Sequence, residues 1–282
     1  MRCAETMRLR FVKMQGLGND FIVVDALAQP IALTPDQIRL LADRRFGVGC
    51  DQVLVIAPPK TAEADIHYRI FNADGGEVEQ CGNGARCVAS YLYEYALAGR
   101  GEIRAETSKG LIAMQRENDG QIRVNMGVPG FEPQQVPIAV ERMEATYRVD
   151  LDGREVRFAA LSMGNPHAVL TVQDCAQAPV ISLGPRLEHH PIFPQRANIG
   201  FMQLIDFNNI FLRVWERGAG ETQACGTGAC AAVVAGRRQG LLGETVDVAL
   251  PGGHLRIQWA GGNAPVWMSG PAVFVFKGEI EL

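Results

Sequence analysis

One short motif occurs twice in this chain of 282 residues, once in each half. The first copy is Gln80-Cys81-Gly82-Asn83-Gly84-Ala85, and the second is Ala224-Cys225-Gly226-Thr227-Gly228-Ala229. Their cysteines are 144 positions apart, so each half of the chain carries one. This repeat indicates a duplicated module, and we expect its two copies to be related by a pseudo-twofold axis.

The correspondence extends well beyond the motif, with offsets of 144 and 146. The aligned pairs include Arg69 and Arg213, Glu77 and Glu221, Asn19 and Asn165, and Gln52 and Asn198. Two cysteines related by such an axis are expected to face each other across one small cleft between the modules. That arrangement suits chemistry on both faces of a single carbon atom.

The chain is long enough for two domains of roughly 100 to 150 residues. Short β-branched segments predict strands at 21–25, 52–56, 66–71 and 122–126, and again at 168–172, 201–205, 210–215 and 272–276. Helices are predicted at 35–43, 85–98 and 229–238. The Pro/Gly break at 127–130 marks the module boundary. The sequence therefore predicts an α/β (α+β) protein with modules 1–127 and 128–270.

Composition excludes several classes of protein. The net charge of −4 is spread over interspersed cations and anions, so no basic field is available to bind nucleic acid. No apolar run reaches the ~18 residues of a membrane-spanning helix. The first dozen residues lack the apolar core of a signal peptide, so we expect a cytoplasmic protein. Seven scattered cysteines favour reduced thiols, and their spacing gives no reason to expect a metal site.

Both motif cysteines come directly before a predicted helix. A helix N-terminus favours the thiolate, so we expect it to lower the pKa of Cys81 and Cys225. The glycines of the motif let backbone N–H groups approach an anion closely, and two facing helix N-termini would hold a carboxylate. The α-carbon of that carboxylate then lies between two sulfurs.

This placement suggests a specific reaction. One thiolate removes an α-proton, the opposite thiol delivers one to the other face, and the stereocentre is inverted. Oriented N–H donors stabilise the carbanion formed next to the carboxylate. The chain has only four lysines, none in a recognisable pyridoxal phosphate setting, so we expect no cofactor.

Several features have a structural interpretation as well. The remaining cysteines, at 3, 50, 87, 175 and 230, are expected to be core residues. Gly16-Leu-Gly-Asn-Asp20 lacks the third glycine of a dinucleotide fingerprint and is expected to be a turn. His167 is either a buried turn residue or a residue near the thiols. Glu216 and Arg217 are either an internal ion pair or a part of the site.

Taken together, the motifs resemble the diaminopimelate epimerase family. The segments that carry the resemblance are 13–21, 71–86, 164–167, 197–198 and 214–229. The resemblance implies two similar modules, each a curved, mostly antiparallel sheet around a central helix, with strand 271–282 returning to the first module. It also implies a homodimer that needs no cofactor and interconverts LL- and meso-diaminopimelate in lysine and peptidoglycan precursor biosynthesis. The family pattern begins near Met7, so residues 1–6 resemble an extension.

The resemblance assigns roles residue by residue. Cys81 and Cys225 are the expected acid/base thiols, and His167 and Glu216 are expected to tune them. The expected substrate contacts are Asn19, Gln52, Asn72, Gly82, Asn83, Asn165, Asn198, Glu216, Arg217, Gly226 and Thr227. A distal carboxylate needs a cation such as Arg217, and a distal ammonium needs acceptors such as asparagine or glutamate oxygens.

Two alternative functions fit parts of the pattern. Proline and hydroxyproline racemases use a similar pair of cysteines, but they typically carry histidine where this chain has Asn83. They also need no group that recognises a distal substrate end, which argues against them here. A thiol redox protein is the second alternative, although the chain has no Cys-x-x-Cys motif.

Overall fold

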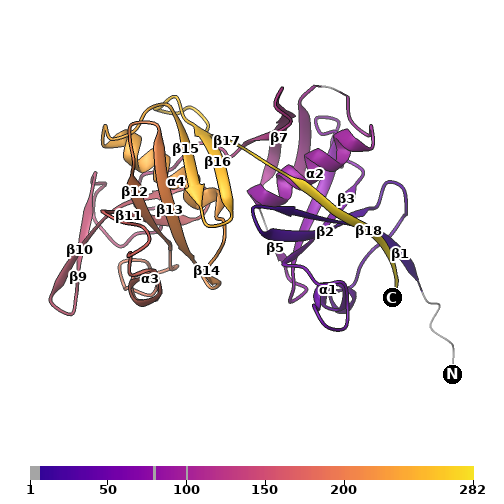
Figure 1. Ribbon diagram of the computed structural model, residues 1–282, viewed down its shortest axis with the longest axis horizontal. Helices are drawn as coiled ribbons and strands as arrows, with labels where there is room; N and C mark the ends of the chain where they lie inside the picture. The colour runs from indigo at the N-terminus through magenta and orange to yellow at the C-terminus, as the bar shows by residue number, and fades with distance from the viewer. Residues whose placement is uncertain (1–6, 79–80, 100) are drawn as a thin grey trace. The chain divides into compact units, whose positions relative to one another are not determined.

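The computed structural model describes residues 7–78, 81–99 and 101–282. The chain divides into two compact units, which we describe separately (Figure 1). Unit 1 runs to Val124 and takes in Gly270–Leu282, whereas unit 2 is Asn125–Ser269. The sequence placed these boundaries at 127/128 and 270/271. Residues 1–6, including Cys3 and the expected extension, lie outside the described residues.

Unit 1 is a mostly antiparallel sheet with two helices. Its strands are β1 (Arg8–Gly16), β2 (Asn19–Asp25), β3 (Gln52–Ala57), β4 (Ile66–Asn72), β5 (Glu77–Val78), β6 (Ile103–Thr107), β7 (Gly110–Arg116), β8 (Ile122–Asn125) and β18 (Val273–Glu281). Its helices are α1 (Pro35–Ala42) and α2 (Gly82–Glu94). The pairs β2–β3 and β4–β6 are parallel, and β1 pairs antiparallel with both β2 and β18.

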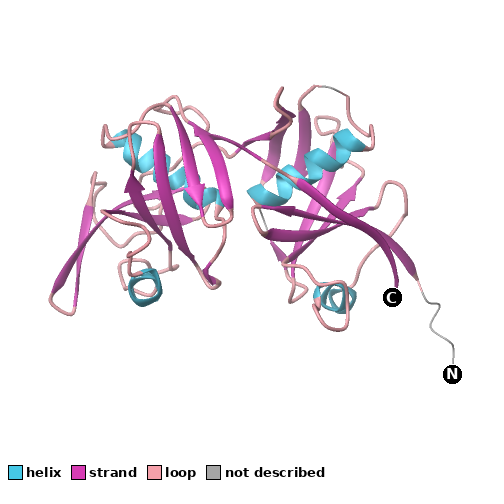
Figure 2. Cartoon of the chain, viewed as in Figure 1, coloured by secondary structure: helices cyan, strands magenta, loops and turns pink. Residues whose placement is uncertain are grey.

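Unit 2 repeats this order. Its strands are β9 (Tyr147–Leu151), β10 (Arg154–Ser162), β11 (Pro166–Val172), β12 (Asn198–Leu204), β13 (Asn209–Glu216), β14 (Gly220–Glu221), β15 (Thr245–Leu250), β16 (Gly253–Gln258) and β17 (Trp267–Gly270). Its helices are α3 (Val180–Glu188) and α4 (Gly226–Arg238). The pairs β11–β12 and β13–β15 are parallel, matching β2–β3 and β4–β6. The expected α/β fold and the duplication are therefore confirmed (Figure 2).

The pleat of each sheet sorts side chains between its two helices, because alternate residues of a strand point to opposite faces. In unit 1, Ile22 and Val24 of β2 pack with Ile38 and Leu41 of α1. The alternate residue Phe21 faces α2, where an added Cβ on Gly84 would lie 3.5 Å from its ring. Each sheet thus has one face for a short helix and another for the helix that follows the cysteine motif.

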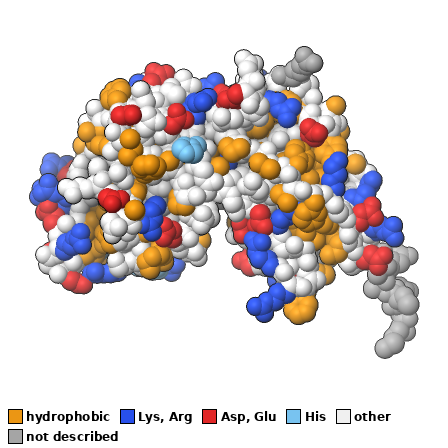
Figure 3. All heavy atoms as spheres, viewed as in Figure 1, with side chains coloured by type: hydrophobic (Ala, Val, Ile, Leu, Met, Phe, Trp, Pro, Cys, Tyr) orange, Lys and Arg blue, Asp and Glu red, His pale blue; other side chains and the backbone are white. Residues whose placement is uncertain are grey.

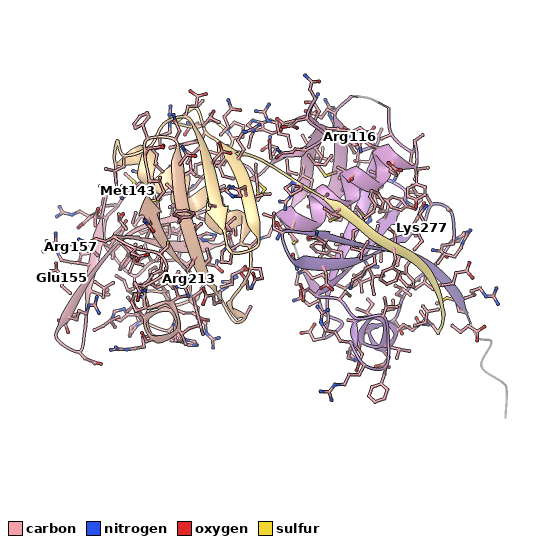
Figure 4. The ribbon with its side chains drawn as sticks, viewed as in Figure 1. Arg116, Met143, Glu155, Arg157, Arg213 and Lys277 are labelled. Carbon is pink, nitrogen blue, oxygen red and sulfur yellow. The ribbon has the colours of Figure 1, made fainter. Side chains whose placement is uncertain are left out.

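An ion pair recurs at equivalent positions of the two units. Arg69 donates to Glu77 through Nε (2.9 Å) and Nη2 (2.7 Å). Arg213 donates to Glu221 in the same way, at 2.6 and 3.0 Å, and Figure 4 labels this arginine on β13. Each bidentate pair joins a long strand, β4 or β13, to the short strand that follows that strand, β5 or β14. The cysteine motif comes after the short strand. The residues aligned by sequence therefore make the same contact in each unit.

The helices differ in detail from those predicted. Helices α2 and α4 begin at Gly82 and Gly226, three residues before the predicted starts at 85 and 229. Helix α2 also ends at Glu94 rather than 98, because Ala96 turns the chain with a φ of +52°. Helix α3 was not predicted. Residues 16–20 form the expected turn, with positive φ at Leu17 and Gly18. None of the described helices is long and apolar enough to span a membrane.

Candidate active site

Both motif cysteines are the N-cap residues of the helices that follow them, as predicted. Cys81 caps α2 in an extended conformation, and its Sγ accepts a hydrogen bond of 3.4 Å from the N–H of Gly84. Cys225 caps α4 in the same conformation. Gly84 and Gly228, the third residues of these helices, allow close packing against the sheet. An added Cβ would lie 3.1 Å from Leu54 at Gly84 and 3.0 Å from Val214 at Gly228.

The Cys81 half-site is the set Asn19, Gln52, Asn72, Cys81 and Asn83 of unit 1. The thiol of Cys81 lies 3.7 Å from Oδ1 of Asn19 and donates to it. The same oxygen accepts a hydrogen bond of 3.3 Å from Nδ2 of Asn83. Nδ2 of Asn19 points the other way and donates to Asp51 at 2.9 Å. Asn19 therefore presents its carbonyl oxygen, not its amide N–H, to the cysteine.

Two further amides of this half-site pair with each other. Gln52 begins β3 and donates through Nε2 to Oδ1 of Asn72 at the end of β4, at 2.8 Å. Strand parity places both side chains on the face of the sheet that packs against α2. Oε1 of Gln52 is buried and has no hydrogen-bond partner in the described part of the chain. A buried acceptor without a partner is costly, so this oxygen is suited to receive a donor group of a ligand.

The Cys225 half-site is the set Asn165, His167, Asn198, Glu216, Arg217, Cys225 and Thr227 of unit 2. Burial raises the pKa of the Cys225 thiol well above its usual value, and the adjacent Glu216 carboxyl raises it further. Glu216 hydrogen-bonds the thiol and accepts a hydrogen bond from the hydroxyl of Thr222. Burial also raises the pKa of Glu216. The lowered thiol pKa expected from the helix N-terminus is therefore wrong for Cys225, because desolvation outweighs the helix.

A chain of hydrogen bonds leads from His167 toward Cys225. Burial, together with the charge of Arg217, lowers the pKa of His167 to about 3, so its ring is neutral. Asn165 donates through Nδ2 to Oγ1 of Thr227 (3.3 Å), so its Oδ1 faces His167 and the proton of that ring is on Nε2 (2.9 Å). Oγ1 of Thr227 lies 3.7 Å from Sγ of Cys225. His167 thus reaches the thiol through two side chains.

Arg217 is held through both its backbone and its side chain. Its N–H donates to Oδ1 of Asn198 (3.0 Å), and its Nη1 donates to the carbonyl of Gln195 (3.1 Å). The buried Glu188, the last residue of α3, accepts hydrogen bonds from Nε1 of Trp215 (2.7 Å) and from the N–H of Gly218. Residues 215–218 are therefore fixed on both sides of Glu216 and Arg217, which do not form an ion pair with each other.

Sequence reasoning missed Asp51, Thr222 and Glu188. Asp51 directly precedes Gln52, and Thr222 lies three residues before Cys225, but a side chain that acts through another residue gives no motif of its own. Glu188 could have been found from the duplication. Adding the offset of 146 residues to the bounds of α1 gives residues 181–188, which lie within α3. Among the described residues, no cluster of three or more His, Cys, Asp or Glu side chains is arranged to hold a metal ion.

Solved structures with low sequence identity share the fold. A hydroxyproline epimerase from Agrobacterium vitis, solved with trans-4-hydroxy-L-proline, superposes with a TM-score of 0.71 at 15% identity, covering 98% of this chain and 93% of that one. A PhzF-family phenazine biosynthesis protein from Bacillus anthracis gives a TM-score of 0.69 at 18% identity, covering 97% and 99%. At these identities the likeness concerns the fold alone.

Sequence relatives are much closer. The profile of the family described as Diaminopimelate epimerase matches residues 11–132 and 159–275. The protein named diaminopimelate epimerase from Nitrosospira multiformis is 56% identical over 98% of this chain and 99% of its own length. That from Thioalkalivibrio sulfidiphilus is 57% identical over 98% and 100%. The resemblance inferred from the motifs is thus confirmed, and the chain belongs to the diaminopimelate epimerase family.

Proposed function

We propose that this chain interconverts LL- and meso-diaminopimelate, with Cys81 and Cys225 as the two acid/base groups. Membership of the family makes it an isomerase of the epimerase type that acts on a small molecule. The observation that carries the mechanism is the cysteine N-cap at the start of the central helix of each duplicated unit. The two helix N-termini supply N–H groups for the carboxylate beside the reacting carbon.

The proposed proton balance is simple. In one direction a thiolate takes the α-proton, and the other thiol gives its proton to the opposite face of the carbanion. The two sulfurs then exchange protonation states, so the reverse direction uses them in exchanged roles. Burial raises the pKa of Cys225 and so favours its thiol form, and Glu216 is the hydrogen-bonded group placed to accept or return its proton. Cys81 is the expected thiolate in the complex that uses Cys225 as the acid.

Recognition of the distal amino-acid end is assigned to polar groups away from the sulfurs. Arg217 supplies the cation for a carboxylate, and the partnerless Oε1 of Gln52 supplies an acceptor for an ammonium group. A proline ring has no second amino-acid group to use these contacts. Their presence favours diaminopimelate over the hydroxyproline substrate of the structural relative.

The test is NMR of LL-diaminopimelate in D2O with the reduced protein, with free proline in a parallel sample. Loss of the α-proton signal together with formation of the meso isomer supports the proposal. Exchange of proline alone would move the protein to the racemase alternative. No exchange of either compound would leave the thiol redox alternative.

Single cysteine variants test the two-base mechanism. We expect Cys81→Ala and Cys225→Ala each to abolish turnover, because each variant removes the acid/base group from one face of the α-carbon. Cys230→Ala, a buried cysteine at the fifth position of α4, is the control and should keep activity. Normal turnover by either motif variant would refute the mechanism.

The homodimer is also part of the proposal. Strand β18 exposes Val273, Val275 and Phe276, and apolar side chains gather on this face of unit 1 (Figure 3). A cavity of about 560 Å³, lined in part by Tyr91, Tyr95 and β18, adjoins them and contains none of the candidate site residues. Val275→Glu should shift the mass measured by light scattering from dimer to monomer. We also propose that the protein is cytoplasmic and that its thiols are reduced there. We expect it not to bind nucleic acid.

A further inference from the structure

The two equivalent asparagines of the half-sites have opposite amide orientations. Asn19 turns its Oδ1 toward the cysteine motif, where it accepts from Cys81 and Asn83. Asn165 turns its Nδ2 toward the motif, where it donates to Thr227. Each amide presents its other polar atom to a partner of complementary type on its other side. For Asn165 that partner is the N–H of His167, and for Asn19 it is the carboxylate of Asp51.

We infer that Asp51 is a positioning residue that favours the thiol form of Cys81 in the substrate-free protein by fixing the amide of Asn19. A carboxylate only accepts hydrogen bonds, so it takes Nδ2 of Asn19 and leaves Oδ1 for the cysteine. An acceptor beside a thiol favours the protonated sulfur, whereas a donor favours the thiolate. The inference rests on the proposed role of Cys81 as an acid/base group, but its test does not need turnover.

The hydrogen bonds of Asp51 show what an amide at this position would change. Its Oδ2 accepts from Nδ2 of Asn19 and from the N–H of Asp20 (3.1 Å), while its Oδ1 accepts from Nη2 of Arg44 (2.8 Å). An asparagine at position 51 has one acceptor for these three donors. If its oxygen pairs with Arg44, its NH2 faces Asn19. Asn19 then flips, offers Oδ1 to the new donor and points its own N–H at Cys81.

Two buried titratable groups near Cys81 do not replace this control. Tyr68 of β4 and Cys87 of α2 are buried groups that interact with its charge, and burial raises the pKa of both. Neither therefore supplies a charge at neutral pH. The charged groups on the far side of Asn19 neutralise one another, since Asp20 pairs with both Lys13 and Arg44. Asp51 also pairs with Arg44, so its main effect on Cys81 is exerted through the amide.

The test measures the rate of Cys81 alkylation by iodoacetamide from pH 6 to pH 10, with the modified peptide quantified by mass spectrometry. Cys81 is half-buried, whereas the five other described cysteines are buried, so it should react faster than these five. We expect Asp51→Asn to move the midpoint of the profile down by about one pH unit, which is about tenfold in rate at neutral pH. Asp51→Ala, which adds no donor, should shift it less. Asp36→Asn, which breaks an exposed ion pair of α1, is the control and should leave the profile unchanged.

Loss of a negative charge would also favour a nearby thiolate, so a double variant separates the two causes. In an Asn19→Ala background, adding Asp51→Asn should produce no further shift if Asp51 acts through the amide. The same shift in both backgrounds would show a direct effect of charge and overturn the inference, as would identical profiles for Asp51→Asn and wild type. Epimerase assays of the same proteins test the proposed function separately, because alkylation reports on the thiol whether or not the protein turns over diaminopimelate.

Discussion

Removal of the Glu188 carboxylate is expected to loosen the segment that carries Glu216 and Arg217. The Glu188 side chain is only 3% exposed, and it accepts hydrogen bonds from Nε1 of Trp215 at 2.7 Å and from the N–H of Gly218 at 3.0 Å. Hydrogen bonds to a charged group contribute roughly 1.5–3 kcal/mol each to stability. Their loss is partly offset, because removing the carboxylate also removes the cost of burying its charge. We therefore expect Glu188→Ala to lower the free energy of unfolding by about 3 kcal/mol.

Glu188→Gln gives a graded comparison. It keeps one oxygen for one of the two donors, so it should cost about half as much, roughly 1–2 kcal/mol. For a chain of this size, about 3 kcal/mol corresponds to a fall of roughly 6–12 °C in Tm. The control is Glu155→Ala, which removes an exposed carboxylate that pairs with Arg157 in the same unit (Figure 4) and should leave Tm nearly unchanged.

The assay combines thermal unfolding with kinetics on diaminopimelate. Unfolding followed by calorimetry gives the loss of stability. Below their Tm, KM should rise in both variants because the segment that carries Arg217 is less firmly held at Trp215 and Gly218. Equal Tm values for wild type and Glu188→Ala, or equal losses for the alanine and glutamine variants, would refute the reasoning from these two hydrogen bonds.

Three further outcomes are expected. Gly184→Ala should lower the urea midpoint, because its Cβ would lie 2.6 Å from Cγ of Trp215, whereas the open Gly99→Ala should not. Burial alone would raise the pKa of Asp20, but hydrogen bonds from Arg44 and Lys13 hold this pKa well below its usual range. Stability from Asp20 is thus present above about pH 4 and lost as pH falls below it, so wild type and Asp20→Asn should converge in acid unfolding. Mild oxidants should abolish activity by joining the two motif cysteines, and a thiol reductant should restore it; oxidant-insensitive turnover would contradict facing thiols.

The fold was predictable where local signals agreed with the duplication. Helix α1 has a complete capping box, in which Thr34 and Gln37 exchange hydrogen bonds across the first turn, and Pro35 is its first residue. Helix α3 has no side-chain cap at Pro179 and contains Pro185, so its sequence gives no comparable signal. Only the offset to α1 would have found it. The glycine-rich starts of α2 and α4 have low helix propensity, and burial against the sheet overrides it.

The candidate site was predictable to the level of motifs but not of hydrogen bonds. The repeated cysteine motif correctly indicated that a helix follows each cysteine, although it placed each helix start three residues too late. The ionisation of Cys225 could not be predicted, because it depends on how deeply α4 is buried and on the closeness of Glu216. Orientation of the Asn19 amide likewise depends on Asp51, which is close in space and 32 residues away in sequence.

The departures from symmetry follow from the substrate that we propose. An α-carbon approached by two thiols presents the same task to each unit, and both units meet it with a cysteine N-cap on a buried helix. The distal amino-acid end occurs only once in the substrate, so the formal charges that recognise it need to come from one unit only. Asn72 and Glu216 stand at equivalent positions, the first in a neutral pair with Gln52 and the second beside Thr222 and Cys225. A neutral amide thus stands at position 72 and an ionisable carboxyl at position 216, so the group that hydrogen-bonds the thiol of Cys225 has no ionisable counterpart at the equivalent position of unit 1.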